Sequence, residues 1–124
     1  MCRIGYFGAS TGAAAALYAA AELGDDVAAV VSRGGRPDLA GGRLGDVRSP
    51  TLLLVGSNDS QVLELNRRAR ASMRCTAELR VVAGATHLFE EPGTLAEAAL
   101  SARDGFVRYL LSPHRHPLTA EAAR

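Results

Sequence analysis

Three residues that could together perform acyl transfer stand in different parts of this sequence: Ser10, Asp59 and His87. A carboxylate that accepts a hydrogen bond from one imidazole nitrogen orients the ring, so that the other nitrogen can take the proton of a serine hydroxyl. The serine then becomes a nucleophile toward an ester-type carbonyl carbon. These residue types therefore predict Ser10 as nucleophile, Asp59 as acid and His87 as base.

The residues around Ser10 favour an exposed nucleophile. Gly8-Ala9-Ser10-Thr11-Gly12 matches the pattern G-x-S-x-G between an apolar run and an alanine-rich run. Its small residues allow the strained strand-to-helix turn that lifts a serine hydroxyl out of a sheet. We expect the Thr11 amide, at the start of the helix, to stabilise a developing oxyanion. Because glycine and serine also mark ordinary turns, a purely structural role stays open.

Asp59 and His87 each have a simpler alternative role. Asp59 precedes a helical pattern, so it would cap that helix at least as readily as it would serve in catalysis. His87, in Gly84-Ala85-Thr86-His87, is by itself more typical of an ordinary loop histidine. The occurrence of all three residues after separate predicted strands favours the catalytic interpretation over coincidence.

The elements that must position these residues predict one α/β domain over residues 1–111, followed by a flexible tail at 112–124. Apolar runs alternate with helical patterns, which implies about four parallel strands with flanking helices and right-handed crossovers. Ligands of such sheets lie beyond the carboxyl ends of the strands. We expect strands at 3–9, 27–32, 51–55 and 78–83, and helices at 11–23, 62–73 and from about 92 to before Pro113.

Two further features of these elements are predicted. Residues 33–50 are rich in glycine and contain two prolines, so they form a substrate-facing connection with at most a short helix near 39–47. The last helix is recognised by an apolar series at Leu95, Ala99, Phe106 and Leu110.

The composition is that of a globular protein. Of 124 residues, 48% are hydrophobic and 22% charged, and the formal net charge is +1, which gives no reason to expect a nucleic-acid partner. Cys2 and Cys75 are far apart and lack a C-x-x-C pattern, so we expect free thiols and a cytoplasmic protein. No leader and no stretch of about twenty apolar residues is evident, so neither export nor a membrane is expected.

Three stretches of the chain resemble the dienelactone-hydrolase-like branch of the α/β-hydrolases. They are residues 4–12, residues 31–39 and residues 84–93, the last of which reads Gly-Ala-Thr-His-Leu-Phe-Glu-Glu-Pro-Gly. The resemblance covers nearly the whole chain up to about Leu111. It implies a hydrolase acting on a small ester, lactone or thioester through Ser10, with Asp59 and His87 in the roles given above.

The resemblance is not complete. True dienelactone hydrolases use cysteine where this chain has Ser10, so dienelactone is not expected as the substrate. Close relatives are fused to a phosphoribosyltransferase domain, and nothing in this sequence resembles that domain. A nucleotide-binding domain is the competing interpretation of the first strand and turn, but neither G-x-G-x-x-G nor G-K-[ST] is present. We expect no cofactor and no metal.

The fold class expected is thus a truncated α/β-hydrolase, because the family has about eight strands and its nucleophile follows the fifth. The absent strands would include a loop that supplies a second oxyanion donor, and losing one donor typically costs about 100- to 1,000-fold in turnover. The strand at 3–9 would be an unpaired sheet edge. We therefore expect a homodimer, a separate amino-terminal half or a fragment of a longer gene, and the alternative function is a non-catalytic or weakly active interaction module.

Several other residues have predicted roles of lesser weight. Arg33 and Arg36 follow the second strand and are candidates for binding a substrate carboxylate or phosphate, although solvated loop arginines are common. Glu90 and Glu91 suit a helix amino terminus better than catalysis. His114 and His116 form an H-x-H without a third metal ligand nearby. The wet face of a helix is assigned to Arg67, Arg68, Arg70 and Arg74.

Overall fold

The computed structural model describes residues 3–110 of the chain. In this range four strands form one sheet in which every neighbouring pair is parallel. The strands lie side by side in chain order, as β1 (Ile4–Ala9), β2 (Val27–Arg33), β3 (Thr51–Gly56) and β4 (Ala77–Val82). The predicted α/β fold with four parallel strands and flanking helices is confirmed.

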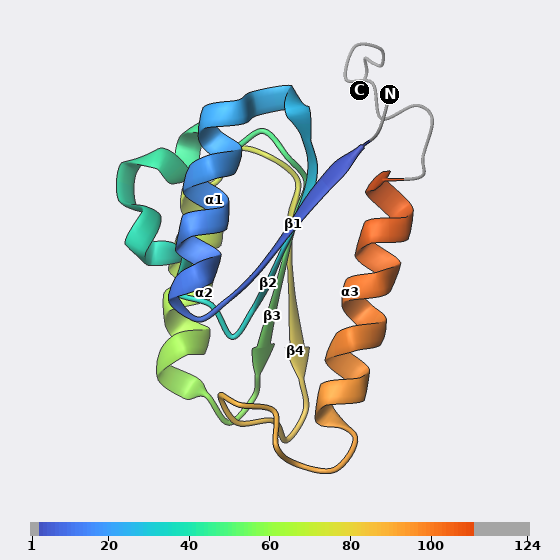
Figure 1. Cartoon of the computed structure of the whole chain (residues 1–124). Helices are drawn as coiled ribbons and strands as arrows, with labels where there is room; N and C mark the ends of the chain where they lie inside the picture. Colours follow the sequence, from blue (N-terminus) through green and yellow to red (C-terminus); the bar gives the residue numbers. More distant parts are fainter. Residues whose placement is uncertain (1–2, 111–124) are drawn as a thin grey trace.

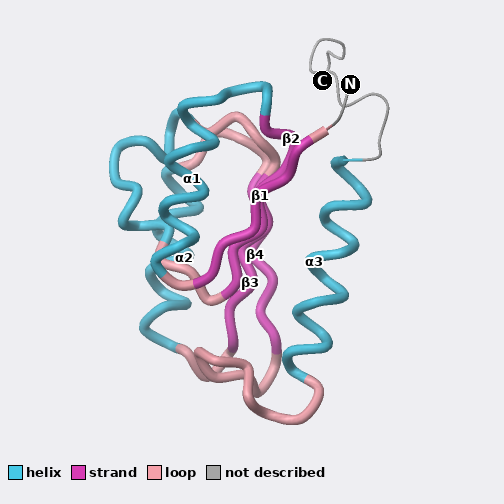
Figure 2. Tube along the Cα trace, in the orientation of Figure 1, coloured by secondary structure: helices cyan, strands magenta, loops and turns pink. Residues whose placement is uncertain are grey.

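Helices cover both faces of this sheet (Figure 1). In Figure 2, drawn from the same direction, helices lie on both sides of the strands. In chain order the helical elements are α1 (Thr11–Leu23), η1 (Gly24–Asp26), η2 (Pro37–Asp46), α2 (Ser60–Ser72) and α3 (Thr94–Leu110). Because the strands are parallel, the loops that follow them gather at one edge of the sheet.

β3 is buried along its whole length. Leu54 contributes to an apolar cluster with Val31 and Val82 beneath α3. A second cluster fills the other face, where Leu17 of α1 packs with Val30 of β2. A parallel strand that is covered on both faces requires a continuous apolar run, and such a run predicted β3 from the sequence.

β1 forms one edge of the sheet. Within residues 3–110 it pairs with β2 and with no other strand. Two of its large apolar side chains, Ile4 and Phe7, are 51% and 52% exposed. The outer side of β1 is therefore an apolar strand edge in the described part of the chain.

Most element boundaries agree with the sequence prediction. α1 has the predicted bounds, and it ends where Gly24 takes a φ of 58°, a left-handed conformation that glycine adopts without strain. α2 begins at Ser60, slightly before the predicted start. The connection after β2 contains more helix than the short segment predicted near 39–47, because η2 begins already at Pro37. A kink at Gly41, where φ is 57°, interrupts it.

α3 lies within the predicted range, but the apolar series by which it was recognised does not as a whole form its buried face. Leu95 is 54% exposed and Ala99 is exposed, whereas Phe106 is partly buried against the core. The face that meets the sheet consists of small residues: Thr94, Ala98, Ser101 and Ala102. Small side chains allow the helix to approach the branched residues of the strands closely, so the larger apolar side chains at its start are turned outward.

Of the four arginines predicted to form the wet face of a helix, Arg67, Arg68 and Arg70 are exposed on α2, whereas Arg74 is exposed beyond the end of that helix at Ser72. Among the described residues, no helix is both long enough and apolar enough to cross a bilayer. The predicted tail at 112–124, with His114 and His116, lies outside the described residues, as does Cys2.

Candidate active site

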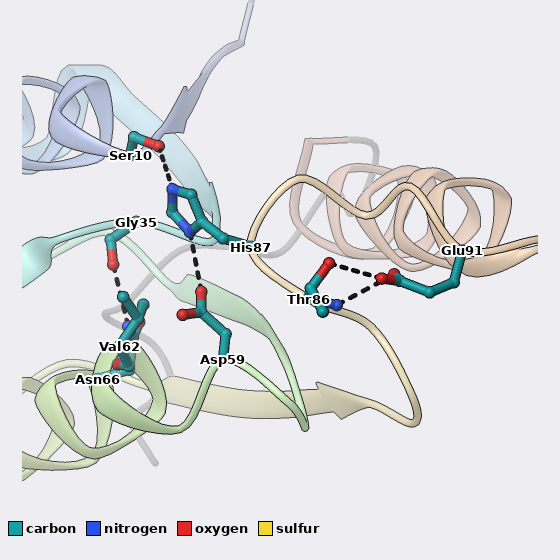
Figure 3. Close-up of polar contacts among 8 residues, drawn as sticks. All are labelled: Ser10, Gly35, Asp59, Val62, Asn66, Thr86, His87 and Glu91. Atoms are coloured by element: carbon teal, nitrogen blue, oxygen red, sulfur yellow. Dashed lines mark hydrogen bonds and ion pairs between the residues drawn. The ribbon is translucent and has the colours of Figure 1, made fainter.

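The side chains of Ser10, His87 and Asp59 form a continuous hydrogen-bonded series (Figure 3). Ser10 Oγ lies 2.9 Å from His87 Nε2, and His87 Nδ1 lies 2.8 Å from Asp59 Oδ2. The three residues follow β1, β4 and β3, so they come from three loops at the same sheet edge. The structure thus brings together all three residues singled out in the sequence, and their catalytic roles stay predictions.

Ser10 is held in a strained turn between β1 and α1. Its φ is 51°, in the left-handed region that costs a non-glycine residue about 1–3 kcal/mol. Its side chain makes no capping hydrogen bond to α1, although it occupies the position before the helix. The hydroxyl is directed to His87 instead, which is not what an ordinary helix-capping serine does.

The backbone around Ser10 explains how the turn is held. The Ser10 carbonyl accepts hydrogen bonds from the amides of Ala13, at 3.2 Å, and Arg36, at 3.0 Å. At Gly8 a Cβ would lie 2.6 Å from the Gly12 carbonyl oxygen, so the strand and the helix start approach each other too closely for a side chain. Packing therefore requires glycine at position 8, whereas a Cβ at Gly12 would meet no atom within 4 Å.

Asp59 precedes α2 but does not cap it. Its side chain makes no hydrogen bond to the helix amides, and Oδ2 accepts from His87 Nδ1. The Asp59 side chain is 13% exposed and that of His87 is 39% exposed. The Asp59 carboxylate is therefore better shielded from water than the His87 ring. Such shielding strengthens the attraction between a carboxylate and the imidazolium that forms when a histidine takes up a proton.

Asn66 on α2 supports the loop behind Ser10 and was missed in the sequence. Its side chain is fully buried and donates to the Gly35 carbonyl at 3.0 Å and to the Val62 carbonyl at 2.8 Å. At Gly35, next to Arg36, a Cβ would collide with Ser32 Oγ and Ala13 Cβ. In the sequence, Asn66 stands out only as a polar residue on the apolar side of the predicted helix. The spacing of apolar residues alone does not reveal it.

Comparison with known proteins connects this arrangement to a family. A search of protein-family models found no match. In structure, the chain is similar to a dienelactone hydrolase from Anabaena variabilis, with 51% sequence identity and a TM-score of 0.86 over 87% of this chain and 50% of that enzyme. Over most of its length the chain is therefore similar to half of a dienelactone hydrolase, and it has the α/β fold of such hydrolases.

Two more distant solved structures share the α/β-hydrolase fold. The esterase domain of a Rhodothermus marinus protein is 20% identical, with a TM-score of 0.75. The match covers 86% of this chain and 61% of the esterase-domain chain. A predicted CIB-like hydrolase from Thermoplasma acidophilum is 21% identical with a TM-score of 0.65, over 83% of this chain and 48% of that one. At these identities the likeness concerns the fold alone.

Among curated proteins, this chain matches two named putative phosphoribosyl transferases from Mycobacterium tuberculosis strains CDC 1551 and H37Rv. Each is 62% identical over 110 residues, which is 89% of this chain and 25% of the relative. The chain therefore spans about a quarter of the length of these curated relatives and half of the Anabaena enzyme.

The two arginines predicted to bind substrate, Arg33 and Arg36, have different surroundings in the structure. Arg36 donates to both carboxylate oxygens of Asp38, at 3.0 and 2.8 Å, and this ion pair raises the pKa of Arg36 and lowers the pKa of Asp38. Arg33 lies over the ring of Phe89, 5.4 Å from its centroid. Because the Arg36 charge already has a partner, Arg33 is the better candidate for an anionic substrate group, and the binding role of both stays a prediction.

Thr11 and the two glutamates also take up the predicted positions. Thr11 is the first residue of α1, so its amide lies at the positive end of the helix dipole. Glu90 and Glu91 precede α3, whose first residue is Thr94, and Thr94 Oγ1 donates to the Glu91 carbonyl at 2.8 Å. The oxyanion role of Thr11 stays a prediction.

Proposed function

We propose that the chain is a serine hydrolase that cleaves a small ester, lactone or thioester through an acyl-enzyme at Ser10. The observation that carries this proposal is the pair of hydrogen bonds, 2.9 and 2.8 Å long, that joins Ser10 Oγ through His87 to Asp59. Both distances are within the hydrogen-bonding range required between a nucleophile and its base, and between the base and the group that orients it. The similarity to a dienelactone hydrolase, at 51% identity, supports the same class of reaction.

In the proposed reaction Ser10 Oγ attacks the carbonyl carbon while its proton passes to His87 Nε2. Asp59 accepts the hydrogen bond from His87 Nδ1 and stabilises the imidazolium. The Thr11 amide donates to the oxyanion of the tetrahedral intermediate. Collapse of the intermediate breaks the bond to the alcohol or thiol, which leaves with the proton from His87. Water, deprotonated by His87, then attacks acyl-Ser10, releases the acid and restores the hydroxyl.

Phosphoribosyl transfer, named for the Mycobacterium tuberculosis relatives, is not proposed for this chain. Those names describe proteins of which the chain matches 25%. The described residues hold the hydrogen-bonded series of Ser10, His87 and Asp59, which suits acyl transfer. We therefore propose hydrolysis as the activity of this part.

Active-site labelling tests the proposal. The chain is incubated with a fluorophosphonate probe, and the modified peptide is identified by mass spectrometry. We expect one adduct at Ser10 and none in Ser10→Ala, while Ser60→Ala, a control at the exposed first residue of α2, is labelled like the wild type. Labelling of correctly folded protein at other residues only, or equal labelling of Ser10→Ala, would defeat the proposal.

A second candidate function rests on the exposed edge of β1. Ile4 and Phe7 are about half exposed there, and β1 has a strand neighbour on one side within the described residues. On this alternative the chain acts as an interaction module that pairs through β1 with a second copy or with a separate amino-terminal half. Size-exclusion chromatography with light scattering would give a dimer or a complex, whereas a stable monomer at micromolar concentration would count against it.

We also propose that the protein acts in the cytoplasm. Cys75 is a free, partly buried thiol, and burial raises its pKa, so the reactive thiolate is disfavoured. Free thiols are usual where the environment is reducing. Fractionation of the native host followed by immunodetection checks this location, and recovery in an extracellular fraction would contradict it.

A further inference from the structure

The loop between β4 and α3 carries His87 on its exposed side. The His87 side chain is 39% exposed, so packing encloses the ring only in part. Phe89 anchors the loop to the core, since it is 2% exposed and lies in the apolar cluster beneath α3. It does so with a φ of 57°, so the loop makes a sharp, strained bend just after His87.

On the other side of His87, the loop is held by the carboxylate of Glu91. Oε1 accepts the backbone amide of Thr86 at 3.0 Å, and Oε2 accepts the Thr86 hydroxyl at 2.6 Å. Thr94 Oγ1, at the start of α3, lies 3.5 Å from Oε1 and donates to the Glu91 carbonyl at 2.8 Å. One side chain therefore ties the residue before His87 to the start of α3.

Glu91 does not take part in the proposed reaction. Figure 3 shows its carboxylate on the side of Thr86 away from Ser10 and Asp59. The hydrogen bonds from the Thr86 side chain and backbone lower the pKa of Glu91, so the carboxylate is ionised at neutral pH. The neighbouring Glu90 is exposed, and its carboxylate has no hydrogen-bond partner in residues 3–110, which makes it a matched control.

We propose that Glu91 is a positioning residue for His87. By fixing Thr86 at both its amide and its hydroxyl, the Glu91 carboxylate restricts the backbone that delivers the imidazole between Ser10 Oγ and Asp59 Oδ2. This inference rests on the proposed function, in which His87 is the base. Without the restraint the loop gains conformational freedom, and the ring spends less time at the 2.9 Å separation from Ser10 that proton transfer needs.

The test compares Glu91→Ala, Glu91→Gln and Glu90→Ala in the full chain with two measurements. The first is the nitrogen NMR spectrum of the His87 imidazole, assigned by its loss in His87→Gln. The second is the rate of Ser10 labelling by a fluorophosphonate, separated into probe binding and the maximal rate. In Glu91→Ala we expect a maximal rate lower by about 10- to 100-fold with little change in probe binding, together with broadened or shifted imidazole signals.

The glutamine variant distinguishes positioning from a general loss of structure. Its amide oxygen can still accept the Thr86 amide and its NH₂ can donate to Thr86 Oγ1, so we expect recovery to within about fivefold of the wild-type rate. Glu90→Ala should match the wild type in both measurements. If Glu91→Ala does not fold, Thr86→Val replaces it, because valine removes the hydroxyl contact at nearly the same shape and should give an intermediate loss of rate.

The two proposals fail in different ways. If Ser10 reacts with the probe and Glu91→Ala leaves both the rate and the imidazole signals unchanged, the positioning role is wrong and the proposed function stands. If Ser10 is unreactive in the wild type but Glu91→Ala still alters the His87 signals, the proposed function is wrong and the positioning of the ring stands. Equal effects of Glu90→Ala and Glu91→Ala would also overturn the positioning role.

Discussion

The nucleophile and the base of this candidate site are held in two different ways. The Ser10 carbonyl accepts hydrogen bonds from two backbone amides, and Gly8 packs against the helix backbone. The buried Asn66 supports the neighbouring loop through the Gly35 carbonyl. His87 lies in an exposed loop that is tied by a surface carboxylate and one buried ring. The region around Ser10 is thus fixed by buried backbone contacts, and the loop between β4 and α3, here the histidine loop, by one buried ring together with exposed polar contacts.

This difference predicts how each region responds to substitution. A change behind Ser10 disturbs buried backbone, so stability and Ser10 reactivity should fall together. A change in the contacts of the histidine loop disturbs exposed groups, so reactivity should fall with little loss of stability. A joint loss of stability and reactivity therefore identifies a change behind Ser10, and a loss of reactivity alone identifies a change in the histidine loop.

The largest effect is expected at Asp59, which links the two regions. Asp59→Asn replaces the acceptor for His87 Nδ1 with a group that favours the wrong tautomer, so the rate of Ser10 labelling should fall by about 10⁴-fold. The melting temperature should change little. Asp26→Asn is the control, because Asp26 is exposed in η1. A rate for Asp59→Asn within about tenfold of the wild type would show that the carboxylate does not orient the base.

Gly8→Ala should break the nucleophile region. The added Cβ would lie 2.6 Å from the Gly12 carbonyl oxygen and 2.7 Å from Ala13 Cα, and backbone atoms cannot move aside cheaply. We expect a loss of about 1–3 kcal/mol or more in the free energy of unfolding, measured with urea, and loss of Ser10 labelling. Gly42→Ala is the control, since a Cβ there has no atom within 4 Å. Equal unfolding midpoints for both variants would contradict this account of the turn.

Asn66→Ala should lower stability and reactivity together, by a smaller amount. It leaves the buried Gly35 carbonyl without its 3.0 Å donor, which typically costs about 1–3 kcal/mol. Arg67→Ala, at the next and exposed position, should change neither quantity. A variant at Asn66 that keeps wild-type stability but loses reactivity would remove the distinction between the two regions.

The smallest expected effect is the acid response of the histidine loop. The pKa of Glu91 is lowered by its bonds to Thr86, so these contacts are present above the ordinary glutamate pKa and are lost as the pH falls through the lowered value. The NMR shift of the Thr86 amide should therefore change only when the pH falls below the ordinary glutamate pKa, and it should not titrate in this way in Glu91→Gln. A midpoint at or above the ordinary glutamate value would show that the contact is weak in solution.

Much of the fold and the three central residues could be predicted from the sequence, because local patterns encode them. β3 is a continuous apolar run, α1 ends at a glycine, and Ser10, Asp59 and His87 follow strands of a parallel sheet, which places them at one edge. The resemblance in residues 84–93 indicated the family independently of these patterns.

Features that depend on tertiary contacts could not be predicted in this way. The face of α3 is set by how closely Ala98 and Ala102 approach the sheet, not by which of its residues are most apolar. The role of Asn66 depends on a loop distant in sequence. The sequence suggested a helix-terminus role for Glu91, and the folded loop adds the contact with Thr86.

The central claim is that Ser10 becomes acylated because His87 takes its proton, and trapping the acyl-enzyme tests this most directly. The chain is mixed with a p-nitrophenyl ester, quenched in acid and examined by intact-mass and peptide mass spectrometry. We predict an acyl group on Ser10 in the wild type and a greatly reduced amount in His87→Ala. Acylation of Ser10 to the same extent in His87→Ala, or acyl groups only at other residues, would contradict the account.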